Sequence, residues 1–87
     1  MSKLLTVLIP TYNNYEFFLR VIRSYLNDKR IEMIVSDDSN NYIEKNYIES
    51  SCKENNIKYF EGLKQSPSEN WNYLLEMVKT PFFVLNH

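Results

Sequence analysis

Polar side chains that could hold a ligand follow two short apolar runs in the first half of the chain. The first run leads into Pro10, Thr11 and Tyr12, and the second ends in the acidic pair Asp37 and Asp38. Short continuous apolar runs are typical of buried parallel strands. Ligands of open α/β sheets bind at the carboxyl ends of such strands. The sequence therefore predicts a binding edge formed by these residues, although residues 37–39 are also typical of an ordinary Asx-rich turn.

Apolar patterns along the chain predict strands that alternate with helices. The predicted strands cover residues 4–9, 31–36, 57–60 and 82–85, and the predicted helices cover residues 15–26, 43–52 and 66–78. Pro10 should end the pairing of the first strand, because proline donates no ladder hydrogen bond. Asn13 and Asn14 are candidate N-cap residues of the first helix, with Asn13 and Glu16 resembling a capping box, and Ser66 should cap the third helix. The order β-α-β-α-β-α-β indicates an α/β fold with a mainly parallel four-stranded sheet.

Bulk properties exclude several functional classes. The 87 residues are enough for one small domain, residues 1–87, and a net charge of −1 from dispersed acids and bases does not indicate a nucleic-acid partner. No apolar run is long enough to span a bilayer. The single cysteine, Cys52, fits a reducing cytoplasm and is expected to be a small buried hydrophobe. The single glycine, Gly62, excludes the glycine-rich phosphate loops of many nucleotide-binding proteins.

Three segments together resemble the amino-terminal half of a family-2 glycosyltransferase. They are Thr-Val-Leu-Ile-Pro-Thr-Tyr-Asn at residues 6–13, Ile-Val-Ser-Asp-Asp-Ser at 34–39 and Asn-Trp-Asn at 70–72. The resemblance covers essentially the whole chain. It implies a Rossmann-like, three-layer half-domain of the A-type fold with strand order 3-2-1-4. It also implies an inverting enzyme that transfers a sugar from a nucleotide-diphosphate donor, commonly UDP-linked, to a hydroxyl acceptor.

The resemblance assigns roles to individual residues. Pro10, Thr11 and Tyr12 would line the base pocket, with Tyr12 stacked on the base, and Asp38 would accept a hydrogen bond from it. A pyrimidine offers a flat face to an aromatic ring and an imide N–H to a carboxylate, so the chemistry agrees. Asp37 would instead cap the turn. The alternative for Tyr12 is a packed loop aromatic.

The donor's diphosphate and its metal lie further along the chain in this family. Lys64 would face the diphosphate, although a solvated loop lysine is the favoured interpretation of this residue, and Asn72 would help to order the donor site. A divalent metal, Mg²⁺ or Mn²⁺, is expected in the full enzyme at an Asp-x-Asp motif after the fourth strand. This sequence has Asn86 and His87 there. We therefore expect a fragment truncated before that motif, without tight metal binding or transferase activity.

The sequence leaves two hypotheses of function open. The first is the donor-binding half of a glycosyltransferase, whose partner is a nucleotide sugar. The alternative is a non-catalytic nucleotide-binding or self-assembling module. A flavodoxin-like or response-regulator-like domain is disfavoured, because the first strand ends in neither acids nor a phosphate-cradling loop. An apolar fourth strand at residues 82–85 would form an exposed sheet edge, which predicts a homodimer.

Overall fold

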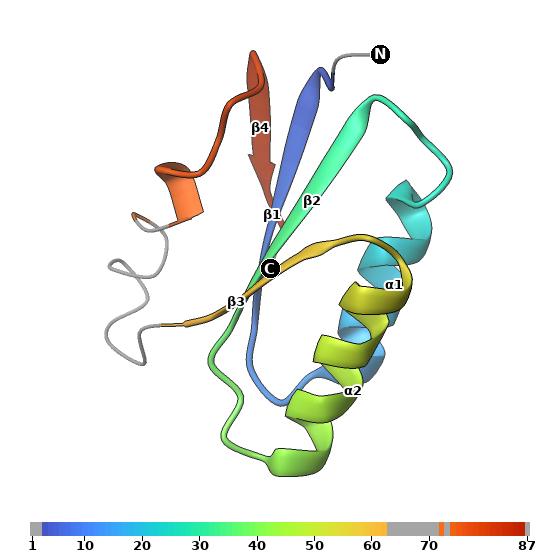
Figure 1. Ribbon diagram of the computed structural model, residues 1–87, viewed down its shortest axis with the longest axis vertical. Coiled ribbons are helices and arrows are strands. Elements are labelled where there is room, and N and C mark those ends of the chain that lie inside the picture. Colours follow the sequence, from blue (N-terminus) through green and yellow to red (C-terminus); the bar gives the residue numbers. More distant parts are fainter. Residues whose placement is uncertain (1–2, 63–71, 73, 87) are drawn as a thin grey trace.

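The sheet is the predicted one. The computed structural model describes residues 3–62, 72 and 74–86. They form a four-stranded, all-parallel sheet in the order β3-β2-β1-β4, which confirms the α/β class and the 3-2-1-4 order (Figure 1). The strands are β1 (Leu5–Thr11), β2 (Ile31–Asp37), β3 (Lys58–Glu61) and β4 (Phe82–Leu85), and the helices are α1 (Tyr15–Tyr25) and α2 (Tyr42–Glu54). None of the helices in these described residues has the length and apolar character that crossing a bilayer requires.

Strand β1 runs further than predicted, through Pro10 to Thr11. Pro10 pairs in register with Ser36 of β2, so the expectation that proline ends the pairing is wrong. The backbones of odd-numbered β1 residues face β2 and those of even-numbered residues face β4, as the bonds from Asp38 N to Thr11 O and from Asn86 N to Leu8 O indicate. The missing N–H of Pro10 therefore points to the β4 side, beyond the last β1–β4 register pair at Leu8 and Leu85. The β1–β2 ladder therefore continues past Pro10, and two more residues extend towards the edge where ligands bind.

Alternating side chains of the central strands pack into two cores on opposite faces of the sheet. One core joins the odd-numbered side chains of β1 and β2 to α1 and α2, which lie together on one side of the sheet in Figure 1. The other joins Leu8 and Ile34 to Leu74, with Met77 and Val78 packed against it. Burial on both faces explains why β1 and β2 read as continuous apolar runs. The predicted start of a third helix at Ser66 lies outside the described residues.

The first turn of α1 is held by a residue of the neighbouring helix. Asn14 is the N-cap residue but its side chain makes no capping hydrogen bond, so the predicted capping box is wrong. Its Oδ1 instead accepts a hydrogen bond from the Tyr12 N–H at 2.8 Å. The N–H of Tyr15, the first residue of α1, donates instead to Oε2 of Glu44 in α2 at 3.2 Å. A carboxylate at this position also suits the positive end of the helix dipole. The start of α1 is therefore tied to the start of α2.

Cys52 is a structural residue of α2. Its side chain is fully buried in the core between the helices and the sheet. Burial, with further contributions from Asp37 and Glu49, raises the pKa of the thiol to about 12. A thiol that stays protonated is a poor nucleophile. This confirms the expectation of a small buried hydrophobe.

Candidate nucleotide-binding site

The loops that follow β1 and β2 are joined through Asn13. The Asn13 N–H donates to Ser39 Oγ at 2.8 Å, and Asn13 Nδ2 donates to Asn40 Oδ1 at 2.7 Å. In return, Asn13 Oδ1 accepts from the Asn41 N–H at 2.9 Å. Asn13 has a φ of 49°, in the left-handed region that asparagine tolerates better than most residues. One residue thus fixes the spacing of two loops at the carboxyl end of the sheet, and we call residues 12–14 and 38–41 the rim.

Asp37 is the buried centre beneath the rim. Only 2% of its surface is exposed. Its Oδ1 accepts hydrogen bonds from Thr11 Oγ1 at 2.9 Å and from both the N–H and the hydroxyl of Ser39, while Oδ2 accepts from the Tyr59 hydroxyl at 2.8 Å. A buried carboxylate is tolerated only with such partners. Asp37 therefore links β1, β2 and β3 and caps the turn after β2, which confirms its expected structural role.

The bond to Asp37 also changes the acidity of Tyr59. Burial raises the pKa of the Tyr59 phenol above its ordinary value, and the hydrogen bond to the Asp37 carboxylate raises it further. Both causes act against a phenolate, because the ion would be poorly solvated and would lie beside another negative charge. Tyr59 is thus a fixed hydrogen-bond donor in this cluster.

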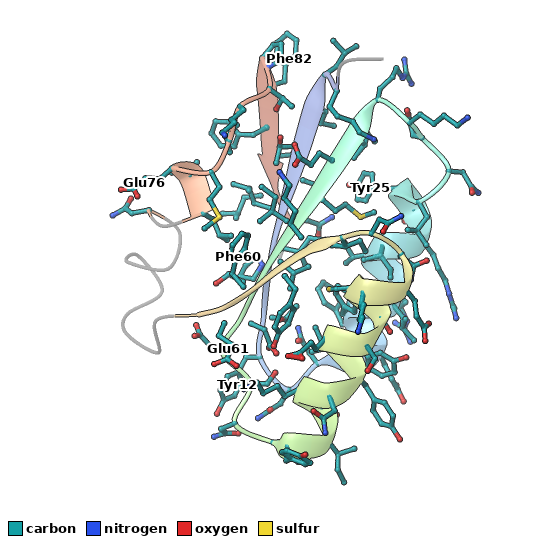
Figure 2. The ribbon with its side chains drawn as sticks, in the orientation of Figure 1. Tyr12, Tyr25, Phe60, Glu61, Glu76 and Phe82 are labelled. Carbon is teal, nitrogen blue, oxygen red and sulfur yellow. The ribbon has the colours of Figure 1, made fainter. Side chains whose placement is uncertain are left out.

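Tyr12 lies at the outer surface of the rim. It is 57% exposed, so it is not a packed loop aromatic. Its hydroxyl accepts a hydrogen bond from Asn40 Nδ2 at 3.0 Å, which attaches the end of the side chain to the second loop. Figure 2 shows Tyr12 at the same end of the molecule as Glu61, the last residue of β3. The ring is therefore both accessible and oriented, as a stacking platform requires.

Asp38 lies beside the buried cluster with its carboxylate under Gly62. Its N–H donates to the Thr11 carbonyl at 2.9 Å, so its backbone continues the pairing of β2 with β1. Gly62 follows β3, and its N–H donates to the Asp37 carbonyl at 2.8 Å. The side chain of Asp38 is half-buried, in contrast to its buried neighbour. The two adjacent acids therefore occupy different environments.

The sequence of the chain matches a model of a known protein family. The model described as Glycosyl transferase family 2 matches residues 6–86. The chain belongs to this family. A comparison with curated proteins finds no match. Members of the family bind nucleotide-sugar donors and generally use a divalent metal.

The other residues predicted for a family-2 donor site differ in burial and in their place in the fold. Pro10 is half-buried at the end of β1, and Thr11 is buried with its hydroxyl bonded to Asp37. Asn72 is exposed, and its carbonyl accepts from the Glu76 N–H at 3.2 Å in a short helical turn. Lys64 lies outside the described residues. The structure thus brings Pro10, Thr11, Tyr12 and Asp38 to adjoining strand ends.

The described residues do not fit the family's metal. In residues 3–62, 72 and 74–86, no three His, Cys, Asp or Glu side chains lie close enough together to hold an ion. Both carboxylate oxygens of Asp37 already accept hydrogen bonds from hydroxyl or amide donors, and the side chain is buried. No step that follows is therefore assigned to a metal.

Four contributors to the site were missed at the sequence level, namely Asn13, Asn40, Tyr59 and Gly62. Asn13 was considered only as a helix cap, and the contact between Tyr59 and Asp37 depends on the β2–β3 register, which no local pattern specifies. Gly62 did carry a signal, because it is the single glycine of the chain. A lone glycine directly after a short strand is typical of a close approach between two backbones.

A hollow lies at the end of the sheet opposite the rim. It has a volume of about 310 Å³ and is lined by the ends of α1 and α2 and the starts of β2 and β3, including Tyr25, Glu32 and Asn56. Lys58 in its wall is paired with Glu32, and Asp28 is paired with Arg30 at 2.8 Å. The two acidic side chains of its lining are thus each paired with a base, and the hollow lies at the amino ends of the strands, whereas open α/β sheets bind ligands at the carboxyl ends.

Proposed function

We propose that this chain binds the nucleoside diphosphate of a sugar donor, with uracil as the base, at the rim. The observation that supports the proposal is the bonding of the two loops through Asn13, which holds an exposed aromatic ring and a carboxylate on adjoining strand ends. In this proposal Tyr12 stacks on the uracil ring, and Asp38 accepts the hydrogen bond of the imide N–H. Membership of glycosyl transferase family 2 supports the class of ligand.

The remaining donor contacts belong to the same proposal. Pro10 and the backbone of Thr11 form the floor of the base pocket, because the Thr11 hydroxyl is already donated to Asp37. In the same proposal Lys64 faces the diphosphate, and Asn72 helps to order the donor site. The single cysteine, buried as a thiol, is consistent with the cytoplasmic location that we propose.

The reaction we propose for the enzyme is sugar transfer with inversion. The acceptor hydroxyl attacks the anomeric carbon on the face opposite the nucleoside diphosphate, the new C–O bond forms as the bond to the leaving phosphate oxygen breaks, and the hydroxyl proton passes to a general base. The part of this chain is to hold and orient the leaving group. A fixed leaving group supplies the geometry that in-line displacement needs.

The proposal is tested by calorimetric titration of the chain with UDP. We expect Tyr12→Ala and Asp38→Asn each to weaken binding about tenfold or more, because base stacking and a hydrogen bond to a charged group each contribute more than about 1 kcal/mol. Phe82→Ala is the matched control, since Phe82 is an exposed aromatic on β4 at the other end of the molecule (Figure 2). Equal affinities in wild type and both rim variants would refute the proposed pocket.

A second candidate function is self-assembly, with or without nucleotide binding. The observation that favours it is the exposure of β4, where Phe82, Phe83 and Val84 are 67%, 53% and 39% exposed. In the described sheet β4 pairs with β1 alone, so its outer edge offers backbone groups to another strand. We propose a two-fold homodimer through β4.

A further inference from the structure

Gly62 approaches the carboxylate of Asp38 more closely than any side chain would permit. A Cβ atom built on Gly62 would lie 1.9 Å from Asp38 Oδ1, 2.5 Å from Cγ and 2.9 Å from Oδ2. All three distances are shorter than a van der Waals contact between non-bonded heavy atoms. Gly62 has no positive φ, so its backbone conformation does not require glycine. The three atoms nearest to such a Cβ all belong to the Asp38 carboxylate.

The backbones on both sides of this contact are fixed. The Gly62 N–H is bonded to the Asp37 carbonyl at 2.8 Å, and the Asp38 N–H is bonded to the Thr11 carbonyl at 2.9 Å. Asp37 is itself held from below by the Tyr59 hydroxyl of β3. A side chain at position 62 therefore cannot be accommodated by a shift of either strand. The atoms that a side chain at position 62 would displace are those at the end of the Asp38 side chain.

We infer that Gly62 is the position that sets base specificity, by leaving the Asp38 carboxylate in place to accept the imide hydrogen of uracil. This inference rests on the proposed function. Asp38 is the residue that contacts the base, and Gly62 is a positioning residue that acts through it. Any larger residue at 62 would rotate the carboxylate away while the buried cluster around Asp37 stays intact.

The chemistry of the base gives this role a specific signature. Uracil presents an N–H at the ring nitrogen where cytosine presents a lone pair, so a carboxylate there accepts from uracil and repels cytosine. A correctly placed Asp38 should thus favour UDP over CDP. Loss of that placement should remove the preference together with the affinity, whereas a general loss of stability would weaken both ligands alike.

The test compares Gly62→Ala, Asp38→Ala and the double variant by calorimetric titration with UDP and with CDP. We expect Gly62→Ala to weaken UDP binding about tenfold or more and to abolish the preference over CDP, as Asp38→Ala does. The double variant should bind no more weakly than Asp38→Ala alone, because both changes remove one interaction. Lys58→Ala at the other end of β3 is the control and should leave both affinities unchanged.

A thermal unfolding series on the same variants tests the contact without any ligand. Gly62→Ala should cost less stability in the Asp38→Ala background than in wild type, because the carboxylate that it meets is gone. Wild-type UDP affinity and preference in Gly62→Ala would overturn the inference and leave the proposed function standing. A wild-type chain that does not bind UDP would instead overturn the proposed function and this inference with it.

Discussion

Two adjacent aspartates have different tasks because successive side chains of a strand point to opposite faces. Asp37 turns towards the helices and is buried among hydroxyl donors from three strands or their loops. Asp38 turns the other way and meets Gly62. The first carboxylate therefore holds the strand ends together, and the second is placed where a ligand can reach it. The two side chains could exchange environments only if the register of β2 shifted by one residue.

The Tyr59–Asp37 bond predicts an alkaline dependence of stability. Tyr59→Phe removes the donor to a buried carboxylate oxygen and should cost about 1–3 kcal/mol near neutral pH. The pKa of Tyr59 is raised in the folded chain, so above about pH 10 the unfolded chain loses this proton while the native chain keeps it. The stabilisation is thus complete below about pH 10 and declines as pH rises further.

Denaturant unfolding of wild type and Tyr59→Phe across this pH range measures the effect. We expect the difference in free energy of unfolding between the two proteins to narrow above about pH 10. Tyr42→Phe is the matched control, because Tyr42 is 77% exposed, and it should track wild type throughout. A difference that stays constant with pH would show that the Tyr59 hydroxyl is not bonded to a carboxylate.

At the scale of elements, β1, β2 and β3 deliver their functional groups at the same end of the sheet because they run parallel. β1 supplies Thr11 and Tyr12, β2 supplies the two aspartates, and β3 brings Gly62 against them. The bond from Glu44 to the start of α1 and the pair between Lys45 and Glu61, at 2.7 Å, attach α2 to the same end. β4 differs, since its exposed apolar side chains contribute to an edge rather than to the site.

The exposed edge predicts concentration-dependent association. Val84→Lys places a charge on β4 and should weaken a dimer through that edge, as charged side chains do on natural edge strands. Val84→Ile keeps the apolar character and is the control. Sedimentation of the three proteins at high micromolar concentration measures the result. A wild-type chain that sediments as a monomer there would contradict the proposed dimer.

The sequence predicted the strands and the sheet better than the details of the loops. Runs of apolar residues identified β1 and β2, because the middle of each strand is buried on both faces of the sheet. The assignment of Asn13 to a helix cap was wrong, because its amide and N–H are used by a loop that follows β2. Contacts of this kind join residues far apart in the chain, so only the strand register determines them.

At the scale of the whole molecule, the two ends of the sheet are chemically distinct. The carboxyl end carries the rim, with Tyr12 exposed above a cluster whose polar atoms are all hydrogen-bonded. The amino end carries the hollow of about 310 Å³, where Glu32 pairs with Lys58 and Asp28 with Arg30. A ligand of this family is expected at the first end, because open α/β sheets bind ligands at the carboxyl ends of their strands. The choice between them is an experimental one.

Amide NMR of the chain during a titration with UDP decides between the two ends. We expect saturable changes of the amide chemical shifts at residues 11–14, 38–41 and 62. The chemical shifts of residues around the hollow, such as Tyr25 and Asn56, should not change. Shift changes confined to that hollow, or no changes at millimolar UDP, would contradict the claim that the rim holds the nucleotide.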